Sequence, residues 1–192
     1  MRQASDSHGV IHDVAVLLRR FDYSETSLVT TWFTEHYGKI RLIAKGARRR
    51  NSAFLGQIDP FQTCEIGWVP SRNSELHTLT ESSAIRTFQP LRADYDRLLA
   101  GTYCAELIEL SCALEDPSSV AFHLLLQAWE YLETHQATLR LLQRFEKALA
   151  VAHGFAGSDD PQERASRALL QHLERTPASR DAAFSICRKA PP

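Results

Sequence analysis

The chain has 192 residues, of which 44% are hydrophobic, so it can build a real core as one large domain or two small ones. Its formal net charge is −1, which excludes a uniformly basic nucleic-acid-binding composition and makes the local distribution of charge the informative quantity. No stretch approaches the roughly 20 apolar residues of a membrane span. The polar segment 1–13 has no signal-peptide core, so we expect a soluble, cytoplasmic protein with access to DNA.

The first half of the chain consists of short runs rich in β-branched and aromatic residues, separated by turn residues. The run 39–44 shows the pattern well, because Ile40, Leu42 and Ala44 fall on one face and the residues between them on the other. Residues 52–57 suit a short helix or a turn. The patterns predict five strands, at 14–18, 27–34, 39–44, 61–69 and 75–80.

The second half has apolar residues at helical spacing, interrupted by breakers such as Asp116-Pro117 and Gly154. The predicted helices are 91–114, 118–133, 137–153, 158–174 and 179–189. We therefore predict an α+β fold, with a five-stranded oligonucleotide-binding (OB-fold) β-barrel at 1–85 and an all-α helical domain at 86–192. The strand count by itself does not separate this barrel from an SH3-like one.

The sharpest local feature is the segment KIRLIAKGARRR at 39–50, which contains six basic residues and no acidic one. Arg19 and Arg20 close the first predicted strand, and in an antiparallel barrel they could lie near this segment. Such a basic stripe attracts phosphates and gives salt-sensitive binding, whereas residues 81–150 are net negative. We predict DNA binding by the basic residues Arg19, Arg20, Lys39, Arg41, Lys45, Arg48, Arg49 and Arg50; the alternative is a solvated loop without a partner.

Aromatic residues near this segment are candidates for stacking on bases. Trp32 and Phe33 are adjacent on one strand and must point to opposite faces, so we expect one in the core and the other to be exposed. Tyr23 and Tyr37 lie in predicted turns and are the better stacking candidates.

Sequence signals for catalysis or metal binding are weak. The four cysteines form no CxxC pair, and His8 and His12, although four residues apart, have no third ligand. Phosphate-binding-loop and nucleophile-elbow motifs are absent. We therefore expect no metal, no cofactor and no enzyme activity. The apolar residues between Leu124 and Leu132 form either the bundle core or a groove for a partner's apolar peptide.

Several segments, in order, resemble the RecO family of bacterial DNA repair proteins. Residues 16–27, VLLRRFDYSETS, are similar to the family's opening strand and turn, and residues 32–49 to its signature, with AKGAR as the strongest piece. SAFLGQIDPF at 52–61 follows in the same order. Tyr103, Glu106 and Leu107 resemble a Y-x-x-E-L motif, and Phe145 to Gly154 an F-E-x-x-L-L-x-x-x-G motif.

The resemblance implies an OB-fold domain and a helical domain that bind single- and double-stranded DNA and anneal complementary strands. It implies partnership with RecR in loading RecA onto strands coated by single-strand binding protein (SSB), and docking of the SSB C-terminal tail on the helical domain. No cofactor or catalysis is implied. Many relatives continue after Gly154 into a four-cysteine zinc module, but 155–163 contains no cysteine, so zinc binding does not carry over.

Three hypotheses remain at this stage. The chain is a DNA-binding recombination mediator, an OB-fold protein-interaction adaptor with weak or no DNA binding, or an enzyme without a recognisable motif. The basic segment together with Tyr23 and Tyr37 favours the first.

Overall fold

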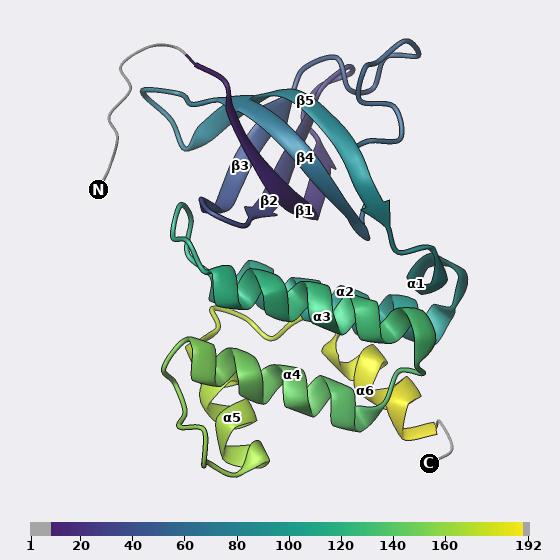
Figure 1. Cartoon of the computed structure of the whole chain (residues 1–192), viewed down its shortest axis with the longest axis vertical. Coiled ribbons are helices and arrows are strands. Elements are labelled where there is room, and N and C mark those ends of the chain that lie inside the picture. The colour runs from purple at the N-terminus through teal and green to yellow at the C-terminus, as the bar shows by residue number, and fades with distance from the viewer. Residues whose placement is uncertain (1–8, 190–192) are drawn as a thin grey trace.

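The computed structural model describes residues 9–189, in which a closed five-stranded barrel stands on a layered group of helices (Figure 1). The strands are β1 (Ile11–Asp22), β2 (Leu28–Thr34), β3 (Gly38–Ala44), β4 (Gln62–Val69) and β5 (Leu76–Thr87). The helices are α1 (Gln89–Ala93), α2 (Tyr95–Ser111), α3 (Ser119–Thr134), α4 (Leu139–Ala152), α5 (Gln162–His172) and α6 (Arg180–Lys189). The predicted fold class, an OB-fold barrel followed by helices, is confirmed.

The barrel closes in the order β1-β2-β3-β5-β4, with every strand pair antiparallel except β3–β5. Its interior is filled by one side of each strand, as the period of two along a strand requires. Trp32 and Ile66 are fully buried there, and the Trp32 indole donates a hydrogen bond to Thr30 Oγ1 at 2.9 Å. The predicted inward face of β3, namely Ile40, Leu42 and Ala44, belongs to the same cluster.

The strand lengths differ from the prediction at two places. β1 continues past the predicted end at Leu18 to Asp22, with a register shift between Leu17 and Arg19, and β5 continues to Thr87. The exposed polar residues of both extensions hide the strand period. The segment 52–57 forms turns and no helix, because its hydrogen bonds, such as Leu55 N to Ser52 O, span three residues and do not propagate.

The prediction of a single helix at 91–114 is wrong, because two helices, α1 and α2, are separated at Asp94. Asp94 is extended, and its carboxylate accepts a hydrogen bond from Arg97 N at 2.9 Å, which caps the start of α2. The periodic leucines on both sides concealed this cap. No helix within residues 9–189 is both long and apolar enough to cross a membrane.

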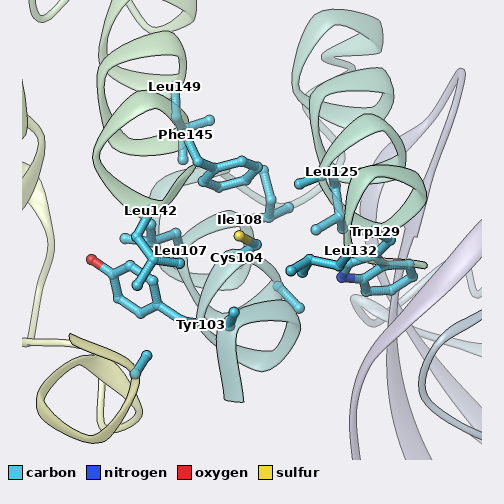
Figure 2. Packing of buried hydrophobic residues seen from close by; sticks show 14 of the residues in the cluster. Tyr103, Cys104, Leu107, Ile108, Leu125, Trp129, Leu132, Leu142, Phe145 and Leu149 are labelled. Carbon is cyan, nitrogen blue, oxygen red and sulfur yellow. The ribbon is translucent and has the colours of Figure 1, made fainter. Parts of the chain in front are cut away.

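The helical core is built mainly where α2, α3 and α4 meet (Figure 2). Trp129 is buried and donates from its indole nitrogen to Gly101 O at 3.1 Å. Gly101 has a steric role, since a Cβ there would lie 2.8 Å from the ring of Phe61. Phe61, directly before β4, therefore packs against α2 and, ring to ring at 5.1 Å, against Trp129.

The barrel and the helices share this apolar cluster. Val16 and Phe33, on the outer side of the barrel, are fully buried in it, so the expectation that only one of Trp32 and Phe33 is buried is wrong: Trp32 fills the barrel and Phe33 the junction. Glu115 N donates to Lys39 O at 2.8 Å, which ties the α2–α3 connection to β3. The domain boundary predicted after residue 85 stays a prediction.

Candidate nucleic-acid interface

The outward-pointing side chains of β1, β2 and β3 form three rows, fixed by the strand register. The first row, Val16–Phe33–Lys39, is covered by the helices. The second row is Arg19–Thr31–Arg41, and the third is Phe21–Val29–Ile43. We call the second and third rows the outer face. In OB folds the surface of strands 2 and 3, together with the loops after strands 1 and 4, binds oligonucleotides.

The second row places two predicted arginines on the same surface. Arg19 and Arg41 flank Thr31, each one strand away from it. Arg19 lies 3.5 Å from a carboxylate oxygen of Glu109, and Arg41 lies 4.0 Å from one of Glu75, with both arginine side chains more than half exposed. Exposed ion pairs of this kind are weak, so a phosphate can compete for both guanidinium groups.

The loop after β3 adds four basic residues beside the third row. Gly46 has a φ of 72°, which lets the chain turn sharply after Lys45. Arg48 donates to Ser24 O at 2.9 Å and pairs with Asp22 at 3.1 Å, so the loop is fastened to the β1–β2 turn. Within residues 9–189, Arg49 and Arg50 are exposed and have no ion pair. The loop stands at the barrel end away from the helices (Figure 1).

Two further predicted DNA-binding residues, Lys39 and Arg20, are engaged within the protein away from this surface. Lys39 is half-buried at the junction, where its Nζ donates to Glu109 O at 2.5 Å, and burial lowers its pKa. Arg20 hydrogen-bonds Ile58 O and pairs with Asp59 at 2.9 Å. Both side chains are occupied away from the second and third rows.

The two predicted stacking tyrosines lie at different ends of the barrel. Tyr23 is 61% exposed at the β1–β2 turn, next to Arg48's contacts. Tyr37 is on the β2–β3 turn and packs edge-on against Trp68 at 5.2 Å. It lines a groove of about 860 Å³ between that turn, residues 70–75 and Glu115. The structure therefore groups Tyr23 with the basic loop and separates Tyr37 from it.

Phe21 is the aromatic residue that the sequence reasoning left out of the site. It lies in the third row and is 49% exposed. The signal was the alternation of Arg19, Phe21 and Tyr23, which points these residues to one side only if β1 extends beyond Leu18.

One cluster in the described residues has the spacing of a cation site. Asp13, Glu35 and His36 bring ligand atoms within 4.8 Å of one another. The Asp13 carboxylate already accepts from Val14 N at 2.9 Å, His36 N at 2.8 Å and His36 Nδ1 at 2.8 Å. The bonds from His36 hold the β2–β3 turn, and the side-chain bond and the charge of Asp13 raise the pKa of His36. Of the tail pair, His12 lies 3.4 Å from Glu81, and His8 is outside the described residues.

A second cluster resembles a cysteine–histidine pair. Cys112 Sγ lies 4.0 Å from His153 Nε2, which is also 3.1 Å from Ser111 Oγ. Burial raises the pKa of Cys112 to about 11 and lowers that of His153. Both shifts oppose a thiolate–imidazolium pair, the form that a nucleophilic cysteine needs.

The helical part has a separate apolar groove of about 300 Å³ between α3 and α4. Leu124, Tyr131 and Leu141 line it, while Leu125, Trp129 and Leu132 from the same predicted apolar face are buried in the core. Arg140 and Arg144, both exposed, stand one helical turn apart at the groove. The groove therefore combines apolar walls with two positive charges.

Together, the barrel, its basic outer face and the attached helices define an OB-fold protein with a helical second part. Residues 9–88 match the model described as recombination protein O N terminal, and residues 92–158 the model described as recombination protein O C terminal. The chain belongs to the RecO family of DNA repair proteins.

Several curated relatives named DNA repair protein RecO are similar to the chain. The protein of Salinibacter ruber is 28% identical over an alignment of 211 residues, which covers 94% of this chain and 77% of the relative. Those of Burkholderia pseudomallei and Rhodopirellula baltica are 37% and 35% identical over 74% and 69% of this chain. The chain spans about half the length of these last two, 50% and 49% respectively.

Proposed function

We propose that the protein is a non-enzymatic DNA repair and recombination mediator that binds single- and double-stranded DNA on the outer face and the loop 45–50. The observation that carries the proposal is the Arg19–Thr31–Arg41 row on the ligand-binding side of an OB barrel, continued by Lys45, Arg49 and Arg50. Nearly neutral overall charge is compatible with this role because the basic groups are gathered in one place.

The proposal includes the partners that the family role implies. With RecR, the protein would promote strand annealing and load RecA onto SSB-coated DNA in the cytoplasm, at the nucleoid. The α3–α4 groove is the proposed dock for the SSB C-terminal tail. Its apolar walls suit apolar side chains, and Arg140 and Arg144 suit carboxylates, including a chain-terminal one.

The direct test is fluorescence anisotropy of a labelled single-stranded oligonucleotide across a salt series. We expect binding that weakens steeply with salt, because each neutralised phosphate on a single strand contributes about −0.7 to the slope of log K against log salt. The Arg49→Ala/Arg50→Ala variant should weaken binding and reduce the slope by about 1.4 if both side chains contact phosphates. Arg48 is left intact because it fastens the loop to Ser24 and Asp22.

Arg164→Ala is the matched control, since this exposed arginine lies on α5 and pairs with Asp160 at 3.1 Å. It should change neither affinity nor slope. Absence of binding by the unmodified protein at low salt would overturn the DNA-binding proposal and support the OB-fold protein-interaction adaptor. Normal binding by the double variant would remove the loop from the site.

A further inference from the structure

Phe21 places a half-exposed aromatic ring at the β1 end of the third row of the proposed DNA-binding surface. Its strand partner in the third row is Val29, which is only 5% exposed, and Val29 in turn pairs with Ile43. Among residues 9–189, Phe21 takes part in no aromatic pair, although most aromatic rings of the protein do. The ring thus has an apolar strand partner and is about half exposed to solvent.

Basic residues lie on the same strand as this ring and directly after β3. Arg19 precedes it by two residues on the same side of β1, and Lys45 directly follows the end of β3, two residues after Ile43. Tyr23 directly follows the end of β1 and is 61% exposed. An exposed apolar strip within a positive surface is the combination that binds a single strand, with phosphates on the cations and base faces on the rings.

We propose that Phe21 stacks on an unpaired base and so gives the outer face its preference for single-stranded over double-stranded DNA. The inference rests on the proposed DNA-binding function and adds to it the form of DNA selected. In a duplex the base faces are stacked on one another, so only phosphates and base edges reach the arginines. Duplex binding therefore gains nothing from Phe21.

Three variants separate ring stacking from apolar packing and from folding. Phe21→Ala removes the ring, Phe21→Leu keeps an apolar side chain without a π-face, and Phe21→Trp keeps a π-face. Tyr95→Ala is the matched control, because Tyr95 is 67% exposed but lies at the start of α2. Thermal unfolding of each variant verifies the fold, which a half-exposed side chain should leave nearly unchanged.

Each variant is titrated with a labelled oligothymidylate, the same backbone with abasic sites, and a duplex of equal length. We expect Phe21→Ala and Phe21→Leu to weaken oligothymidylate binding by roughly 5- to 100-fold, Phe21→Trp to retain it, and all variants to bind duplex equally. The unmodified protein should discriminate against the abasic strand, and Phe21→Ala should lose that discrimination.

The outcomes distinguish this inference from the function beneath it. If the unmodified protein binds oligothymidylate but Phe21→Ala binds it as tightly, or if abasic and intact strands bind alike, stacking on Phe21 is refuted while DNA binding stands. If Phe21→Ala weakens duplex binding as much as single-strand binding, the ring does not select the strand. If no DNA binds to the unmodified protein, the proposed function itself fails.

Discussion

Lys39 and Glu109 join the barrel to the helices through one hydrogen bond: Lys39 Nζ on β3 donates to the backbone carbonyl of Glu109 on α2 at 2.5 Å. Replacing Lys39 by Met keeps the aliphatic stem and removes the donor. We expect the free energy of unfolding to fall by about 1 kcal/mol and the melting temperature by about 2–4 °C. Calorimetry measures both quantities.

Arg41 is the counterpart of Lys39, two residues further along the same side of β3. Within residues 9–189 its one ion pair is the 4.0 Å contact with Glu75, and its side chain is 53% exposed. Arg41→Met should therefore leave the melting temperature nearly unchanged and weaken oligonucleotide binding. If instead Lys39→Met weakened DNA binding without lowering stability, and Arg41→Met did not weaken it, Lys39 would belong to the DNA-binding site.

These two residues show what the sequence could and could not predict. The alternation along β3 correctly predicted which side chains fill the barrel, because strand periodicity is a local property. The predicted basic stripe was read from the same segment, but whether Lys39 faces DNA or the helices depends on how α2 packs, which involves residues 70 positions away. The sequence therefore predicted which basic residues are present, but not how they are arranged. Only the register of β1 with β2 places Arg19 and Arg41 in one row and puts Phe21 on the same surface.

Glu106 anchors the C-terminal helix and gives a physical reason for the Y-x-x-E-L motif. Its carboxylate accepts bonds from Ala178 N at 2.8 Å, Ser179 N at 2.9 Å and Ser179 Oγ at 2.6 Å, at the start of α6, and pairs with Arg175. We expect Glu106→Ala to cost about 1–3 kcal/mol and to loosen α6. Cys187 on α6, now 6% exposed, should then label faster with a thiol reagent. Glu174→Ala, which removes an exposed carboxylate, is the control, and unchanged labelling would refute the anchoring role.

Because of the same carboxylate, the difference in stability between the unmodified protein and Glu106→Ala should depend on pH. Burial by itself would raise the pKa of Glu106, but the bonds from Ser179, Ala178 and Arg175 outweigh it and lower the pKa below 4.5. The stabilisation is therefore complete above pH 4.5 and is lost as the pH falls through the lower pKa of the folded state. The melting temperatures of the unmodified protein and of Glu106→Ala should converge on acidification below pH 4.5. A constant gap across that range would contradict the assignment.

We expect the α3–α4 groove to bind a peptide at a site separate from the DNA-binding surface. Arg140→Glu/Arg144→Glu should abolish binding of an acidic, apolar-ended peptide, measured by anisotropy, and leave oligonucleotide affinity intact. Leu124→Ala should weaken the peptide through the apolar wall alone. Arg188→Glu, an exposed charge reversal on α6 outside the groove, is the control. If the double variant still bound the peptide, the proposed docking site of the SSB C-terminal tail would not be this groove.

Gly38 lies at the junction between the barrel and the helices, where there is no room for a larger side chain. Its φ is 71°, and a Cβ there would lie 2.2 Å from Asp116 O, a backbone atom that cannot move without shifting the α2–α3 connection. Gly56 has a similar φ of 73° but open space around it, so Gly56→Ala should cost only the backbone strain, about 1–2 kcal/mol. Gly38→Ala should cost clearly more, measured by chemical denaturation, because the α2–α3 connection, which the bond from Glu115 N to Lys39 O holds, must shift. Equal losses in the two variants would mean that the close approach at Asp116 adds nothing to the strain of the left-handed backbone.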